Sequence, residues 1–203
     1  MRSLESILHG LILAFGLILP LGVQNIFIFT QGATQPSLGR ALPAMVTAAL
    51  CDTVLILLAV FGLSLLMMQV EGLRTGLMVA GIVFLFYMSV AVWRSSPAGV
   101  GESKPLPIRK QILFACSVSF LNPQSFIDIV GVIGTSALIY SGFELILFTS
   151  ACIAVSWIWF FGLMFAGARM KKLTHQALIM SLLNKGSAIF IFATAVYLGI
   201  GIL

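Results

Sequence analysis

Two carboxylates set deep within apolar segments, Asp52 and Asp128, are the residues of this chain best suited to chemistry. An ionised side chain costs on the order of 2.5–3.5 kcal/mol at the centre of a membrane span, and such residues usually mark ion or substrate paths. We therefore interpret both acids as candidate substrate- and proton-binding residues. The alternative for each is a structural carboxylate that is hydrogen-bonded to the backbone of a neighbouring helix.

Two helix-breaking elements, Pro20–Asn25 and Leu121–Asp128, occur 100 positions apart, each inside a long apolar run. Proline removes a backbone donor and clashes with the preceding turn, so Pro20 and Pro123 should interrupt their helices. Gly22 should loosen the first break further. A pair of interrupted hydrophobic segments at corresponding places in two halves is the best sequence pointer to the binding site of a secondary transporter.

Four amide side chains at these breaks are further candidates for substrate or proton binding: Gln24, Asn25, Asn122 and Gln124. Gln24 and Gln124 match in the repeat and are the better candidates for lining a cavity. The two asparagines could instead cap exposed helix ends. Gln124 precedes Asp128 by four residues, so the two share a face if an α-helix resumes after the break.

Other polar residues within apolar segments carry weaker signals. Ser156 and Trp157 could line a cavity, although a tryptophan in a span more often packs or contacts lipid. We interpret the three cysteines as small buried hydrophobic residues. The two histidines form no metal-ligand spacing, and no nucleophile–base arrangement or phosphate loop stands out. We therefore expect no metal, no cofactor and no enzymatic activity.

The elements that must position these residues are membrane helices. The chain has 203 residues, of which 60% are hydrophobic and only 8% are charged, with a mean hydropathy of +1.13. A soluble domain carries about 25% charged residues, so the composition predicts an all-α integral membrane protein. Its net charge of +5 does not indicate nucleic-acid binding, because the basic residues lie in short links between apolar stretches.

Six apolar runs are long enough to span a bilayer, which takes about 20 residues. They are about Leu4–Thr30, Leu42–Met68, Leu73–Trp93, Gln111–Ile139, Phe143–Ala168 and Gly186–Leu203. The first and fourth exceed the length of a straight span, and these two carry the breaks.

The runs divide into two halves. Residues 95–110 contain three prolines and two glycines and read as a linker between repeats 1–94 and 111–203. Because each half has three spans, the second half must enter the membrane in the opposite sense, which predicts an inverted repeat. Nine Lys and Arg residues fall on the side of the first, third and fifth links and two on the other side. That bias places the basic links in the cytoplasm and both termini outside. If the sixth span did not insert, only the C-terminus would change sides.

Four ordered motifs resemble the LysE family of amino-acid exporters, most closely its lysine/arginine exporter branch. They are Leu19–Gly32, Cys51–Ile56, Phe120–Asp128 and Ser156–Leu163, so the resemblance covers almost the whole chain. It implies a multi-pass protein of the bacterial inner membrane that exports basic amino acids. The branch often has proline where this chain has Val23, so the first break rests on Pro20 and Gly22.

Two membrane-buried acids with no matching buried base suit a cationic guest. Export of a cation from a negative interior costs about 2.3 kcal/mol per 100 mV, and entry of one proton per cation would cancel that electrical cost. Our hypothesis is that Asp52 or Asp128 is shared in turn by proton and substrate. The other expected partner is the lipid bilayer, and assembly of identical chains is left open.

Three other functions are weighed against this hypothesis. Neutral amino acids or related metabolites could replace the basic substrate. A membrane thiol-disulfide electron carrier would need a reactive cysteine in the first and fourth spans, and the first span has none. A metal-ion exporter would need clusters of His, Asp or Glu, which the sequence lacks.

Overall fold

Every regular element that the structure describes is helical. The structure is a computed structural model, and it describes residues 2–19, 22–63 and 105–170, with scattered helical positions between 76 and 94 and between 182 and 200. The elements in chain order are α1 (Arg2–Ile18), α2 (Val23–Thr34), α3 (Leu38–Leu58), the π-helix η1 (Ala59–Leu63), α6 (Ile108–Leu121), α7 (Pro123–Phe126), the π-helix η2 (Ile127–Ile133), α8 (Gly134–Ala137) and α9 (Gly142–Met170).

Two helices in the described ranges are long and apolar enough to cross a membrane by themselves. They are α3 with its π-helical continuation, Leu38–Gly62, and α9. The bent pair of α1 and α2 raises the number to three if it forms one span. These helices correspond to the predicted second, fifth and first spans. The predicted third and sixth spans, Leu73–Trp93 and Gly186–Leu203, lie largely outside the described residues.

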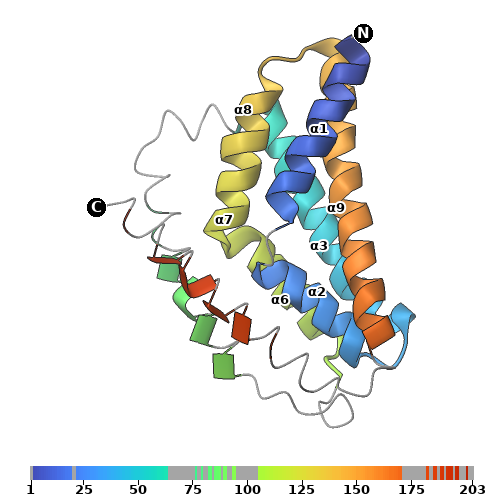
Figure 1. Ribbon diagram of the computed structural model, residues 1–203, viewed down its shortest axis with the longest axis vertical. Coiled ribbons are helices and arrows are strands. Elements are labelled where there is room, and N and C mark those ends of the chain that lie inside the picture. The colour runs from blue at the N-terminus through green and yellow to red at the C-terminus, as the bar shows by residue number, and fades with distance from the viewer. Residues whose placement is uncertain are drawn as a thin grey trace.

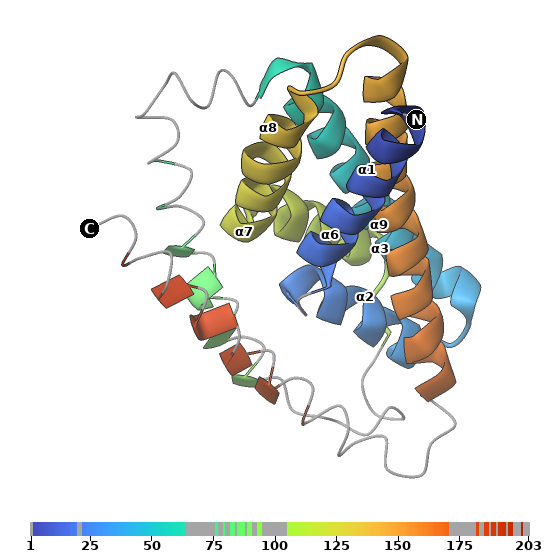
Figure 2. The same ribbon diagram turned by 45° about the horizontal axis from the view of Figure 1, so that its top comes forward.

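The helices are interrupted at both places where the sequence predicts a break. α1 ends at Ile18 and α2 begins at Val23, with the two axes bent by 79°; Pro20 lies outside the described residues. The second interruption is at Asn122, which is extended (φ −83°, ψ 110°) between α6 and α7. Figure 2 shows α2 turned away from the direction of α1.

The segment after the second break differs from a regular α-helix. It is α-helical only from Pro123 to Phe126 and then continues as η2, which contains Asp128. The condition under which Gln124 and Asp128 would share one α-helical face is therefore not met. The predicted fourth span is a series of short elements instead of a single straight helix.

α9 is the central packing partner of the first half. It lies beside both α1 and α2, as Figure 1 shows, and it also packs against α3. Glycines allow this close approach: a Cβ on Gly32 would overlap the carbonyl oxygen of Met164, and one on Gly167 would overlap that of Phe29. Small residues at such interfaces let membrane helices pack backbone to backbone. The side chains of Phe148 and Phe160 in α9 are fully buried, and each belongs to a different hydrophobic cluster of the core.

Two buried glutamines join the α2–α3 connection to the segment that precedes α6. Gln35 and Gln111 are each 1% exposed. The Nε2 of Gln35 donates to the Leu106 carbonyl at 2.9 Å, and the Nε2 of Gln111 donates to the same oxygen at 2.9 Å. Gln111 also donates to the Arg40 carbonyl at 3.1 Å. One carbonyl thus accepts from both halves of the chain.

The shared acceptor predicts that Gln35→Ala and Gln111→Ala are not additive. Either single change leaves the Leu106 carbonyl with one donor, whereas the double change leaves it with neither of these donors. We expect the double variant to lose about 1 kcal/mol more stability than the sum of the singles, within the range that contacting residues show. Thermal unfolding of the four proteins in detergent measures this coupling. Strictly additive losses would contradict the shared role of Leu106.

Candidate functional site

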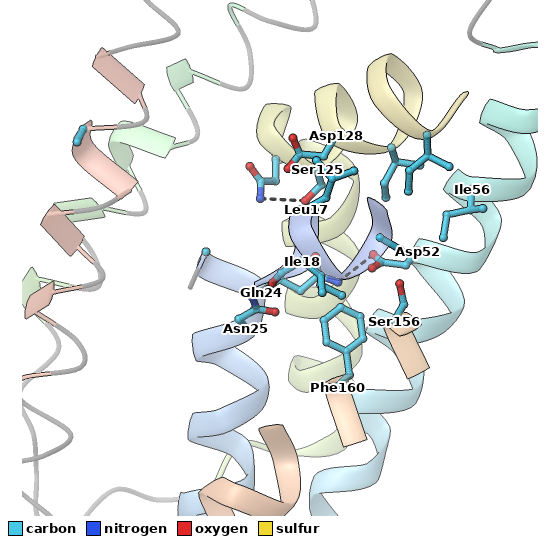
Figure 3. A pocket seen from close by; sticks show the side chains of 16 residues that line it. Leu17, Ile18, Gln24, Asn25, Asp52, Ile56, Ser125, Asp128, Ser156 and Phe160 are labelled. Atoms are coloured by element: carbon cyan, nitrogen blue, oxygen red, sulfur yellow. Dashed lines mark hydrogen bonds between the residues drawn. The ribbon is translucent and has the colours of Figure 1, made fainter. Parts of the chain in front are cut away.

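A cavity of about 430 Å³ lies where the two helix breaks meet the middle of α3 and α9. Such a volume is within the range of small-molecule sites, which are about 300–1,000 Å³. The polar residues that line it are Gln24, Asn25, Asp52, Asn122, Ser125, Asp128 and Ser156, with Gly22 at the first break. Apolar side chains complete the wall, among them Ile18, Ile56 and Phe160. Figure 3 shows the two acids on different elements around this space.

Asp52 is the buried acid of the cavity. It projects from α3, is 6% exposed, and accepts a hydrogen bond from the Nε2 of Gln24 at 3.1 Å. The hydroxyl of Ser156 on α9 points toward the same carboxylate (Figure 3). A carboxylate has about four acceptor positions. Gln24 on α2 and Ser156 on α9 thus orient Asp52. Its carboxylate keeps further acceptor positions, which can receive a cationic partner.

The second acid lies across the cavity, on the part of the chain that follows the second break. Asp128 is half-buried in η2. Beside it, the Nδ2 of Asn122 donates to the Oγ of Ser125 at 3.1 Å, so this asparagine fastens the break to the first turn after it. Ser125 was not singled out from the sequence, although its spacing of three from Asn122 is the signal that could have indicated the pair. π-Helical turns are rare and often occur at functional sites.

Asn25 secures the first break. Its Nδ2 donates to the carbonyl of Ile18 at 2.8 Å, and its Oδ1 accepts from the indole N–H of Trp159 at 3.3 Å. The last carbonyls of a helix have no partner within it, so Asn25 satisfies one at the end of α1. Asn25 thus caps a helix end through a carbonyl, whereas an N-cap side chain accepts from the amides at a helix start. Asn25 lines the cavity as well, so it is a positioning residue and a wall residue at once.

We expect Asn25→Ala to destabilise the break. The change removes the hydrogen bonds from Asn25 to the Ile18 carbonyl and from the Trp159 indole to Asn25, and an unsatisfied buried polar group costs about 1–3 kcal/mol. Trp159→Phe removes only the indole donor and should cost less. Thermal unfolding of both variants in detergent gives the comparison. An Asn25→Ala protein as stable as wild type would show that the break does not depend on this side chain.

Trp157, which the sequence suggested as a cavity residue, is placed beside the site. Trp157 is not among the described residues that line the cavity; its indole donates to the Oγ1 of Thr53 at 3.1 Å, on the residue after Asp52. It therefore packs α9 against α3 beside the site. The side chains of Gln124 and Pro123 lie outside what the structure describes.

Within the described ranges, no three His, Cys, Asp or Glu residues gather in a way that could hold a metal ion.

The charges around the cavity have one sign. Its lining includes two acids and, among the described residues, no lysine, arginine or histidine. At the first break, α2 begins at Val23 with Gly22 as its N-cap, which supplies no side-chain cap for the first-turn amides. Amides at a helix N-terminus attract anions. The cavity thus combines two carboxylates with the start of α2 around one space.

Comparison with known proteins shows which family the chain belongs to. The family described as "LysE type translocator" matches residues 15–201. The chain belongs to the LysE family. It is therefore a membrane transporter of the amino-acid exporter type. Proteins of the LysE family are transporters and not enzymes.

Individual relatives cover nearly the whole chain. "Putative amino-acid transporter YisU" of Bacillus subtilis (strain 168) is 47% identical over 201 residues, which is 98% of this chain and 91% of the relative. Arginine exporter protein ArgO of Salmonella schwarzengrund (strain CVM19633) is 29% identical over 186 residues, covering 87% and 84%. ArgO of Escherichia coli O157:H7 is 29% identical over 180 residues, covering 84% of each chain. No solved structure matches the chain.

Proposed function

We propose that this protein exports basic amino acids, L-arginine or L-lysine, across the bacterial inner membrane in exchange for protons. One observation carries the proposal: Asp52 and Asp128 line the same cavity, and its described lining has no base. The names of the arginine exporters, at 29% identity, support the same substrate class.

The two acids would bind the side chain of the substrate. A guanidinium group can bridge a carboxylate through two parallel hydrogen bonds, and an ammonium group can pair with it as a point charge. The α-carboxylate of the substrate would lie toward the start of α2, where Gly22 lines the cavity. Apolar wall residues such as Ile56 and Phe160 would contact the aliphatic part of the side chain.

Proton exchange would use the same acids. Asp52 is the better candidate for the shared carboxylate because it is the more deeply buried of the two and is fixed by Gln24. When the substrate cation leaves, a proton can neutralise the carboxylate, which avoids an unpaired buried charge. Exchange of one cation for one proton moves no net charge, so the membrane potential would not oppose export.

In the proposed architecture, the protein consists of two inverted three-helix repeats, 1–94 and 111–203, which are joined by a cytoplasmic linker over 95–110. Each broken segment then supplies one side of the cavity, and both termini lie outside. Alternating access in such transporters is largely a rocking of one repeat against the other around a fixed site. The junction at Leu106, where Gln35 and Gln111 meet, lies at the end of that linker.

A growth assay identifies the substrate. A host strain with and without the gene is given a panel of dipeptides, which are cleaved inside the cell and raise one amino acid at a time. We expect the gene to relieve inhibition by arginine- or lysine-containing dipeptides and not by those of neutral residues. Relief confined to a neutral amino acid would favour the second candidate, an exporter of neutral amino acids or related metabolites, for which the apolar wall of Ile18, Ile56 and Phe160 provides support.

A further inference from the structure

Two thiols from different halves of the chain meet next to the cavity. The Sγ of Cys51 on α3 contacts the Sγ of Cys116 on α6 at 3.8 Å. Both are free thiols; Cys51 is buried, and Cys116 is partly exposed. The third cysteine, Cys152, is also buried but directs its thiol to the carbonyl of Gly10 at 3.6 Å.

We propose that Cys51 and Cys116 form a dithiol site at which oxidation to a disulfide locks α3 to α6 and stops transport. The sulfur atoms need to approach to about 2.05 Å, the length of a disulfide bond. They are already in contact at 3.8 Å, so closing the bond requires rotation of the two side chains and a shift of the helices that brings the sulfur atoms together. The effect on transport rests on the proposed function, but the presence of the dithiol site does not.

The chemistry is a two-electron oxidation by a membrane-permeant diazene. Both S–H bonds break and one S–S bond forms. Two electrons and two protons pass to the diazene, which becomes a hydrazine. The partly exposed Cys116 first adds through its sulfur to the N=N bond, and Cys51 then attacks that sulfur, so the S–N bond breaks, the S–S bond forms and the hydrazine leaves.

The lock follows from the position of the two helices. α3 belongs to the first proposed repeat and α6 to the second, and they pack against each other. Cys51 immediately precedes Asp52, so a covalent bond there fixes the helix that carries the buried acid. If the repeats must move relative to each other during transport, a bond across this contact prevents the motion.

The test counts thiols in the purified protein before and after treatment with diamide, a membrane-permeant diazene. N-ethylmaleimide labelling under denaturing conditions should show three free thiols before oxidation and one after it. Cys152→Ser should go from two to none, whereas Cys51→Ser and Cys116→Ser should keep two. Retention of all three thiols in wild type would overturn the dithiol site.

The same treatment on vesicles decides the lock. Arginine export by wild type and by Cys152→Ser should fall to background after diamide and recover with dithiothreitol, whereas Cys51→Ser should keep its activity. Formation of the disulfide with undiminished export would overturn the lock. If the reduced wild-type protein moved no arginine or lysine at all, the proposed function would fail, while the thiol count would still decide the dithiol site.

Discussion

Asp52→Asn is expected to abolish arginine export without unfolding the protein. Asparagine has nearly the same shape as aspartate, and its Oδ1 can still accept the hydrogen bond from Gln24 that the native carboxylate accepts. The fold should therefore persist. What disappears is the negative charge in the cavity, and loss of one partner of a buried charge pair costs about 3–5 kcal/mol. That corresponds to about a hundredfold or greater loss of affinity for the cationic substrate.

The measurement is export of labelled arginine from loaded vesicles with and without an imposed proton gradient. Wild type should respond to the gradient and Asp52→Asn should not, because the variant has no carboxylate there to protonate. Asp128→Asn should retain part of the response, since this acid is less buried. Undiminished, gradient-dependent export in both variants would reject a shared carboxylate.

Gly167→Ala is expected to be among the most destabilising single-methyl changes in the chain. The added Cβ would overlap the carbonyl oxygen of Phe29, which is backbone and cannot rotate away. Overpacking costs about 1–3 kcal/mol and more where the backbone must shift. We therefore expect a loss of about 3 kcal/mol or more, together with separation of α2 from α9.

Gly162→Ala is the matched control on the same helix. A Cβ at Gly162 meets nothing within 4 Å, and alanine is the better helix former. This variant should be as stable as wild type or slightly more so. Thermal unfolding of both proteins in detergent separates the two cases. Equal melting temperatures would show that α2 and α9 are not in close contact in the membrane protein.

The sequence was sufficient for the features that depend on composition and local pattern. A long uninterrupted apolar run predicts α9, and the Asn-Pro pair at residues 122–123 predicts the second break, because proline and its neighbours restrict the backbone locally. Asp52 and Asp128 stand out because an acid within an apolar run is expensive. These inferences need no knowledge of how the helices pack.

Other features could not be predicted because they depend on how distant segments meet. Gln24 lies 28 positions before Asp52, and only the bend between α1 and α2 brings its amide to the carboxylate. Trp159 supports Asn25 through a contact 134 positions away. The glycines of close contact resemble any other glycine in a span, and no residue pattern marks the change from α- to π-helix in η2.

The 79° bend also determines how much of the membrane the first segment crosses. A straight helix rises about 1.5 Å per residue, so the 17 residues of α1 extend about 25 Å and the 12 of α2 about 18 Å. At this angle, α2 adds only about 3 Å along the axis of α1. The pair therefore reaches about 28 Å, close to the 30 Å thickness of the hydrocarbon core. If α1 stands upright, α2 lies nearly parallel to the bilayer surface, and its surplus length widens the protein instead of lengthening the path of the substrate.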